Sequence, residues 1–237
     1  MKIEAILYDP SSIGIKLAPD VVDSCYGPII QSGGKYNLKP SAQSNDDKLK
    51  FDVIICSLGA RYMSYCSNIS RTFMIDPPHK INQTYAVLSD LYDKCLEQMV
   101  AGGEIKSVLE SAKAYLSRRD ASLLPFLTKT VGFATGLEFR DNTLMLNGTN
   151  TTKFLPGMVF IISVGFQDVP LLPADKAGAA LSIQKLDTFS LLISDTVRIQ
   201  TDGGVPEVLT KASRSFEDVS YNITDKVRWH FIFARIN

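Results

Sequence analysis

The chain has 237 residues, of which 45% are hydrophobic and 21% are charged. This length and composition are sufficient for a sizeable buried core and predict a soluble globular protein of one or two domains. Lysine plus arginine and aspartate plus glutamate each number 25, so the formal net charge is zero, which excludes a bulk electrostatic affinity for DNA, RNA or an anionic membrane.

No segment is typical of a membrane span or a secretion signal. Lys2, Glu4 and Asp9 interrupt the start of the chain, which therefore lacks the apolar core of a signal peptide. No run of about 18 apolar residues is present. The four cysteines show no CxxC spacing, which favours reduced thiols inside a cell.

The N-terminal part of the chain is rich in residues that break regular structure. Residues 1–25 include Pro10 and Pro19 and are expected to form a lead-in of short helices and loops. Residues 26–37, YGPIIQSGGKYN, are predicted to be a turn-rich approach to a strand.

The next segment, residues 51–76, predicts a β-hairpin around which the rest of the chain is arranged. It reads FDVIICSLGARYMSYCSNISRTFMID, with two apolar runs on either side of a turn signal at residues 59–61. Ser57 and Asn68 are small polar residues on the two strands, at positions where a hairpin can direct both side chains toward one point.

Two helices are predicted after the hairpin. Pro77-Pro78 stop the strand, apolar residues then recur at helical spacing, and Gly102-Gly103 form a C-terminal stop signal. A second helix is predicted over residues 105–118, with one apolar and one charged face.

The pattern then returns to strands. Residues 128–146 are strand-like, and the dipeptide at 147–148, Asn-Gly, predicts a type I′ hairpin turn. A strand is expected after the Pro-Gly pair at 156–157, and a hairpin or pair of strands over residues 181–200. Hairpins on either side of two helices predict an α+β layer fold.

Four segments, SLGARYMSYCSNISRTF, GFATGLEF, LPGMVFIISVGF and LLISDTVRI, resemble in order and spacing the metal-binding segments of the methionine aminopeptidase, prolidase and creatinase family. The resemblance implies the pita-bread fold, an α+β architecture of curved antiparallel sheets with helices on the outer face. In active members two Asp, one His and two Glu hold a pair of divalent ions that activate water. By position, these ligands fall on Ser57, Asn68, Phe133, Ser163 and Ser194.

All five side chains are neutral, which predicts that the chain binds no metal or other cofactor and has no catalytic residue. Two dications bring four positive charges, and an uncompensated charge in a desolvated cavity costs several kcal/mol or more. His79 and His230 lie outside the matched segments, so no base is assigned to activate a serine. Asp195 follows Ser194 directly and is expected on the opposite face of its strand.

Longer phrases, YGPIIQSGGKYNL, SYCSNISRTFMIDP, GFATGLEFRD and KFLPGMVFIISVGFQD, resemble an inactive branch of this fold: the peptidase-like domains in large subunits of FACT histone chaperones. This resemblance covers residues 26–210 and places the chain as the second lobe of an N-terminal module. It leaves residues 1–25 as a lead-in and residues 211–237, ending in the aromatic stretch VRWHFIFARI, as a tail of uncertain structure.

That resemblance implies a nuclear chromatin protein that reorganises nucleosomes in transcription, replication and repair. The implied partners are core histones, nucleosomes and, through the full-length subunit, an HMG-type subunit, with no membrane and no sequence-specific nucleic acid. Arg71, Glu138 and Arg140 are candidate contacts at the rim of the old peptide cleft. A structural ion pair or a solvated charge is the alternative for each.

Two other functions are compatible with the fold. An active metal-dependent aminopeptidase or prolidase with a relocated site requires peptide turnover that a chelator abolishes. An inactive relative that binds ribosomes or RNA requires salt-dependent RNA binding, against which the neutral composition counts.

Overall fold

The expected hairpin forms the centre of the fold in a computed structural model, which describes residues 5–6, 9–18, 21–44, 47–177 and 179–222. Strands β3 (Val53–Tyr62) and β4 (Tyr65–Ile75) pair antiparallel along their whole lengths. The turn lies at Met63 and Ser64, whose φ angles of 47° and 70° suit a type I′ turn. The turn predicted at residues 59–61 is wrong, because these residues continue β3.

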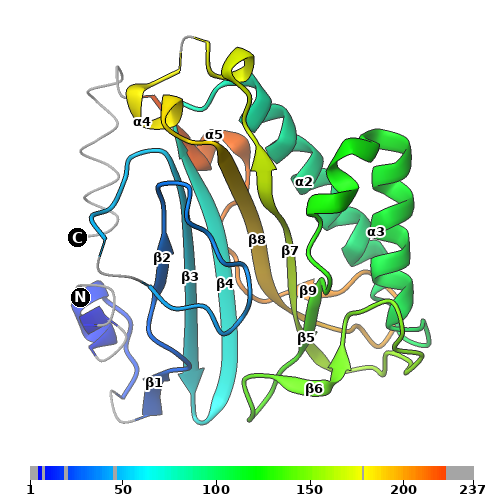
Figure 1. Ribbon diagram of the computed structural model, residues 1–237. Helices are drawn as coiled ribbons and strands as arrows, with labels where there is room; N and C mark the ends of the chain where they lie inside the picture. Colours follow the sequence, from blue (N-terminus) through cyan, green and yellow to red (C-terminus); the bar gives the residue numbers. More distant parts are fainter. Residues whose placement is uncertain (1–4, 7–8, 19–20, 45–46, 178, 223–237) are drawn as a thin grey trace.

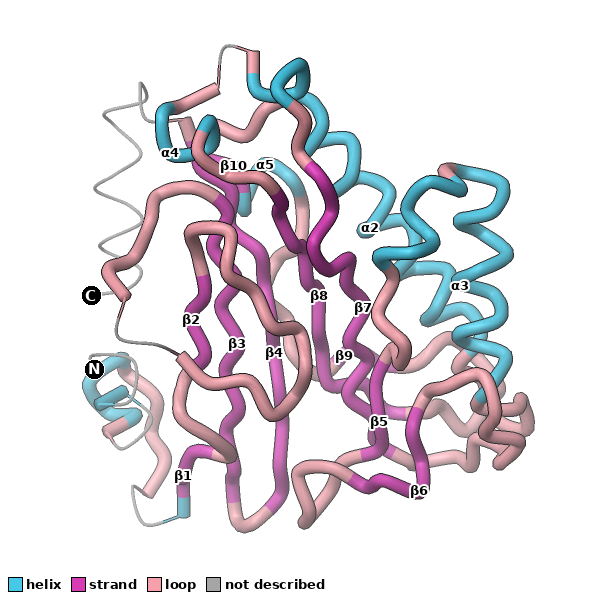
Figure 2. Tube along the Cα trace, in the orientation of Figure 1, coloured by secondary structure: helices cyan, strands magenta, loops and turns pink. Residues whose placement is uncertain are grey.

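The hairpin is part of one curved sheet with the strand order β1, β3, β4, β8, β7, β5, β6 (Figures 1 and 2). The remaining strands of this path are β1 (Val22–Ser24), β5 (Gly132–Ala134), β6 (Asp141–Met145), β7 (Val159–Pro170) and β8 (Thr188–Arg198). Three short strands join its neighbours: β2 (Ile29–Gln31) pairs with β3, β9 (Glu207–Val208) with β8, and β10 (Ser220–Tyr221) with β4. All of these pairings are antiparallel except that of β10, which is parallel.

Two long helices, α2 (His79–Gln98) and α3 (Lys106–Arg119), cover one side of the sheet (Figure 1). Both predicted helices are therefore confirmed. The first begins directly after Pro78 and ends before Gly102-Gly103. Five short helical turns are also present: η1 (Pro10–Ile13), η3 (Ala121–Phe126), η4 (Pro173–Lys176), α4 (Leu181–Gln184) and α5 (Phe216–Val219).

Two strand predictions in the second half of the chain are wrong. Residues 147–148 do not close a hairpin: β6 pairs with β5, and the Asn147 side chain instead accepts hydrogen bonds from the backbone of Thr149 and Asn150. Residues 181–200 form one short helix followed by the single long strand β8. The Asn-Gly signal at 147–148 therefore belongs to the loop that follows β6.

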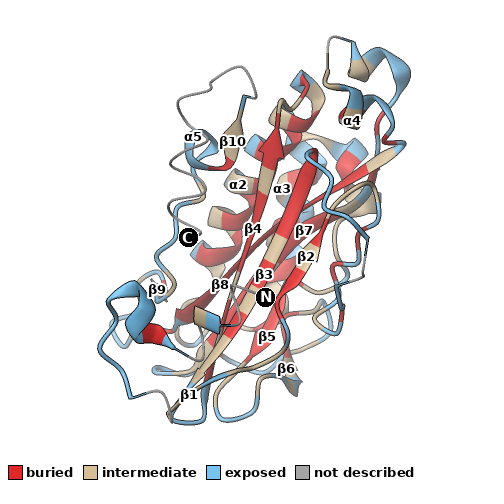
Figure 3. Ribbon diagram, turned by 90° about the vertical axis from the view of Figure 1, so that its left-hand side faces the viewer, coloured by how far each residue is buried: buried red, intermediate tan, exposed pale blue. Residues whose placement is uncertain are grey.

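The sheet is buried on both faces along its central strands (Figure 3). The large core fills the helix side and extends along the sheet, whereas a small hydrophobic cluster of Phe133, Met145 and Ile161, with Phe139 against it, lies on the other face. The α+β architecture, with helices on the outer face of an antiparallel sheet, is as expected. The face without helices is the one that holds the predicted site.

The C-terminal part of the described chain contacts the sheet. After residue 210 it forms α5 and β10, and β10 pairs with β4. The aromatic stretch and His230 lie outside the described residues.

Cys25, Cys56, Cys66 and Cys95 are free thiols. Within the described ranges, no helix combines the length and apolarity that crossing a bilayer requires.

Candidate functional site

The sheet brings the five predicted ligand positions together on its helix-free face. Side chains alternate between faces along a strand, so register decides which residues meet. Ser57 on β3 pairs with Ser70 on β4, Ser70 pairs with Ser194 on β8, and Ser194 pairs with Ser163 on β7. Phe133 lies on β5, which pairs with β7.

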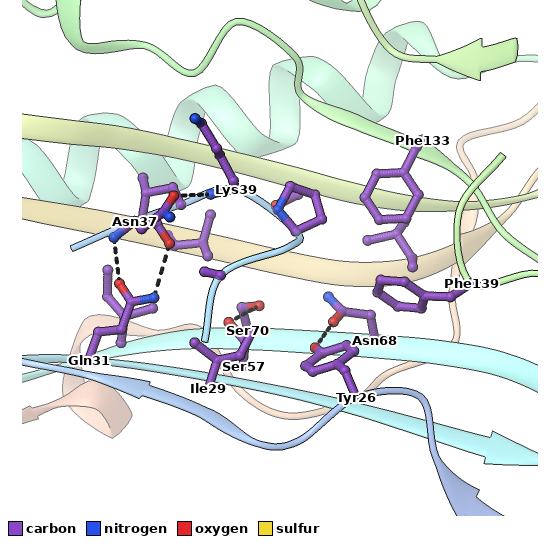
Figure 4. Close-up of a pocket in the computed structure, with 17 residues that line it drawn as sticks. Tyr26, Ile29, Gln31, Asn37, Lys39, Ser57, Asn68, Ser70, Phe133 and Phe139 are labelled. Carbon is purple, nitrogen blue, oxygen red and sulfur yellow. Dashed lines mark hydrogen bonds between the residues drawn. The ribbon is translucent and has the colours of Figure 1, made fainter. Parts of the chain in front are cut away.

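A small cavity marks the meeting point (Figure 4). Ser57, Asn68, Phe133 and Ser163 line it, and Ser194 is fully buried next to Asn68. Its open volume is about 30 Å³, which holds about two water molecules. The cavity is therefore too small to admit a peptide substrate.

A chain of neutral hydrogen bonds runs through this site. The Tyr26 hydroxyl donates to Asn68 Oδ1, Asn68 Nδ2 donates to Ser194 Oγ at 2.8 Å, and Ser194 Oγ donates to the Ile162 carbonyl at 2.9 Å. Burial raises the pKa of the Tyr26 phenol, which keeps the proton that the first bond requires. Each donor in the chain has an acceptor, so the polar side chains satisfy one another without a cation.

The Tyr26 ring reaches this position because residue 59 has no side chain. Gly59 pairs with Asn68 across the hairpin, and a Cβ at residue 59 would lie 2.4 Å from Tyr26 Cε1. The glycine that suggested a turn is thus needed for close packing inside a strand.

Aromatic rings fill the rest of the site. Phe139 packs edge-on against both Tyr26, at 5.1 Å between ring centroids, and Phe133, at 5.6 Å. Such edge-to-face contacts are favourable beyond the area they bury. The site is consequently held by packing as well as by hydrogen bonds.

A loop between β2 and β3 covers the cavity from the helix-free side. Gln31 Oε1 accepts from the backbone N–H of Asn37, and its Nε2 donates to the Asn37 carbonyl (Figure 4). Leu38 is buried, and its backbone N–H donates to Gln167 on β7. These bonds fix the loop over the site.

The residues present do not fit a pair of divalent ions. Phe133 has no donor atom, and the oxygen and nitrogen of the Asn68 amide are both engaged within the protein. Among the described residues, no group of three or more His, Cys, Asp or Glu is arranged to hold an ion. His79 is the first residue of α2 and does not line the cavity.

Arg71 is not at the cleft rim. It follows Ser70 on β4 and therefore points to the opposite, helix side of the sheet, where it is 5% exposed. There it forms a 2.8 Å ion pair with Asp195, which also accepts from Tyr92 of α2. The expectation of a rim contact fails for this residue, and the structural ion pair describes it.

All five guanidinium donors of Arg71 are used. Besides Asp195, they bind the carbonyl oxygens of Ser70, Ser194, Ala212 and Ser213. The arginine thus joins β4 and β8 to the segment that follows residue 210.

Glu138 and Arg140 are both on the segment between β5 and β6, at the protein surface. The Arg140 guanidinium lies over the Phe133 ring, 5.6 Å from its centroid, which brings it to the edge of the site. Glu138 lines a separate groove and does not line the cavity.

Tyr26 is a residue of the site that the sequence pattern did not indicate. Its contact with Asn68 spans 42 positions, so no local spacing reveals it. The available signal was its place at the head of the phrase YGPIIQSGGKYNL, which carried part of the resemblance.

Comparison with known proteins places this geometry in context. The model of metallopeptidase family M24 matches residues 3–201. FACT complex subunit SPT16 of Zea mays is 39% identical over 226 residues, which are 94% of this chain and 20% of that relative. The chain thus spans only 20% of the length of the curated relatives it matches first.

Solved structures show similarity to the same two groups of proteins. The N-terminal domain of FACT complex subunit SPT16 from Cicer arietinum has a TM-score of 0.83 at 38% identity, covering 92% of this chain and 50% of that one. An X-Pro aminopeptidase from Thermotoga maritima has a TM-score of 0.69 at 20% identity, covering 94% and 55%. The latter likeness shows the fold alone, and together they confirm the α+β pita-bread architecture.

Proposed function

The chain belongs to metallopeptidase family M24, and from this membership and its likeness to the N-terminal domain of FACT complex subunit SPT16 we propose that it is a non-catalytic, histone-binding module of a FACT large subunit. In this proposal Ser57, Asn68, Phe133, Ser163 and Ser194 are vestigial ligand positions. The module contributes a folded surface and no chemistry.

The observation that carries the proposal is the neutral hydrogen-bonded chain from Tyr26 through Asn68 to Ser194. A metallopeptidase needs carboxylates at this place to neutralise its ions and a cavity that admits the scissile peptide. Here the polar atoms are bonded to one another and the remaining space is about 30 Å³. Both features favour a binding module over an active peptidase.

Binding is proposed to occur at the rim of the old cleft, through Glu138 and Arg140. A histone tail offers lysine and arginine side chains to the carboxylate and backbone carbonyls to the guanidinium. Both residues lie at the surface, and Arg140 is oriented by its contact with Phe133. The interior of the site supports this surface by keeping β5 and the following segment in place.

At the level of the whole protein, we propose a role in nucleosome reorganisation in the nucleus during transcription, replication and repair. Core histones and nucleosomes are the proposed partners, and an HMG-type subunit is reached through other parts of the full-length protein. This part of the proposal rests on the relatives' name, FACT complex subunit SPT16.

A first experiment separates a binding module from an enzyme. The purified chain is analysed for bound metal, assayed on unblocked dipeptides with added Mn²⁺ or Zn²⁺, and used to pull down core histones. The proposal predicts histone capture with neither stoichiometric metal nor turnover. Turnover that EDTA abolishes would establish the peptidase instead.

A second experiment tests the rim. The chain is titrated against core-histone dimers and core-histone tetramers, and the Glu138→Gln/Arg140→Gln variant is compared with Glu110→Gln/Lys113→Gln, which removes one acid and one base from the exposed face of α3. The rim variant is expected to bind about fivefold more weakly, and the α3 variant to match the wild type. Equal affinity of all three proteins would remove the rim from the proposal.

A further inference from the structure

An open groove lies beside the hairpin tip, separate from the filled cavity. One wall is Tyr65, the first residue of β4, and the other is the segment between β5 and β6, which lies next to the tip at one end of the sheet (Figure 1). Residues 157–159, where β7 begins, complete the lining. The volume of the groove is about 340 Å³, at the lower end of the range for sites that bind small ligands or peptide side chains.

The two walls are held together by the backbone. The Cys66 N–H donates to the Gly136 carbonyl at 2.8 Å, which ties the start of β4 to the segment opposite. A turn between Gly136 and Glu138, closed by a 3.0 Å backbone bond, fixes the shape of that segment. A groove with fixed walls loses little conformational entropy when a ligand binds.

The apolar part of the lining comes from the Tyr65 ring together with Leu137, Leu144, Met158 and Val159. Leu137 is 69% exposed and Tyr65 is 45% exposed, so both present apolar surface to solvent. Large apolar side chains exposed next to one another are typical of interaction sites.

The charged residues of the lining are both acidic. The Glu138 carboxylate has no hydrogen-bond or ion-pair partner among the described residues, and the Asp141 carboxylate is held by hydrogen bonds from Thr143. Those bonds lower the pKa of Asp141, which keeps it ionised at neutral pH. Within the described part of the chain, no lysine or arginine lines the groove.

From this combination we propose that the groove binds a basic peptide segment, with one apolar side chain placed between Tyr65 and Leu137 and flanking lysine or arginine side chains paired with Glu138 and Asp141. A purely apolar partner would leave these two carboxylates unpaired, and an acidic partner would place like charges next to them. The inference rests on the proposed function only in that a histone tail is one such basic segment.

The groove is tested with defined peptides on the full chain by fluorescence anisotropy. The probe is a fluorescein-labelled heptapeptide with one central leucine between lysines and arginines. Its counterparts carry serine in place of the leucine, or glutamate in place of every basic residue. We expect the leucine probe to bind more tightly than the serine peptide, and the acidic peptide not to bind.

Protein variants locate the contact. Glu138→Gln is expected to weaken the leucine probe about threefold and Leu137→Ser about tenfold, whereas the matched controls Glu110→Gln and Leu181→Ser, outside the groove, leave it unchanged. All of these side chains are exposed, and circular dichroism checks that each variant is folded.

The outcomes distinguish this inference from the proposed function. Equal binding of the leucine and acidic peptides, or unchanged binding in both groove variants, would overturn the groove. Peptide binding that follows the expected order, in a chain that captures no histones, would overturn the histone proposal and leave the groove standing.

Discussion

Arg71 and Asp195 form a 2.8 Å ion pair on the helix side of the sheet, while their chain neighbours Ser70 and Ser194 face the candidate site on the other side. Strands β4 and β8 therefore make a charged contact on the helix side of the sheet and a neutral contact, between Ser70 and Ser194, on the other side. The charged contact is buried beneath α2, and the neutral contact lies at the candidate site. Structural support and the candidate site share the same strand pair.

Replacing Arg71 with methionine is expected to lower the free energy of unfolding by about 3 to 5 kcal/mol. Asp195 would remain buried without its cation, and carbonyl oxygens of Ala212 and Ser213 would lose their donors. Urea unfolding measures the change. The control Arg198→Met breaks an exposed pair with Glu207 and should cost about 1 kcal/mol or less. Similar losses in the two variants would contradict the structural role of Arg71.

Gly59→Ala is expected to destabilise the protein by about 1 to 3 kcal/mol, because the new methyl group would overlap the Tyr26 ring. The loss should shrink in a Tyr26→Ala background, where the methyl group has space. A double-mutant cycle measured by urea unfolding gives this coupling. Gly27→Ala, a position with no atom within 4 Å of the added carbon, is the matched control. A coupling of zero would show that the two residues do not touch.

The sequence predicted the hairpin, both long helices and the convergence of the ligand positions, because these depend on periodicity and on the order of the motifs. The prediction that Arg71 lies at the cleft rim was wrong. Its neighbour Ser70 faces the site, and because adjacent residues of β4 point to opposite faces, Arg71 points away from it. The same rule placed Asp195 correctly, opposite Ser194. Alternation was sufficient evidence in both cases.

Other features had no local signal. Gly59 was interpreted as part of a turn. A single sequence does not distinguish a glycine needed for a turn conformation from a glycine inside a strand that leaves space for an aromatic ring. Tyr26 lies far from Asn68 in sequence, and only the folded sheet brings them together. The groove at the hairpin tip likewise depends on the approach of β4 to the segment after β5.

The buried carboxylate of Asp52 should make stability depend on pH. Burial raises the pKa of Asp52 above its ordinary value of 3.8, although the Gly33 N–H donates to it. The folded state then binds the proton more tightly than the unfolded state. The contribution of Asp52 to stability therefore falls as pH rises from its unfolded pKa to its folded pKa, and is constant above the folded pKa. Relative to Asp52→Asn, the wild type should lose unfolding free energy as the pH rises from the ordinary pKa of Asp52 to the raised pKa of the folded state.

Urea unfolding of both proteins across this pH range provides the measurement. Asparagine keeps an oxygen for the Gly33 N–H but does not titrate, so the change in the difference with pH isolates the charge of Asp52. A pH-independent difference would mean that Asp52 has the same pKa in the folded and unfolded states.

Placing one carboxylate in the site tests whether its neutral hydrogen bonds tolerate a negative charge. Asn68→Asp keeps an acceptor for the Tyr26 hydroxyl but removes the amide that donates to Ser194. Asn68 is 7% exposed, so the new charge would be buried with no cation beside it. We expect a loss of about 1 to 3 kcal/mol in unfolding free energy at neutral pH.

Two further measurements identify the cause of that loss. A buried aspartate has a raised pKa in the folded state, so the deficit should shrink as pH falls through that pKa and the carboxyl becomes protonated. Added Mn²⁺ or Zn²⁺ should not restore stability, because one carboxylate among Ser57, Phe133 and Ser163 cannot balance a divalent ion. Asn142→Asp, on the exposed part of β6, is the control and should be nearly neutral at all pH values. Rescue of the Asn68→Asp variant by either ion would instead show that the cavity still accepts a metal.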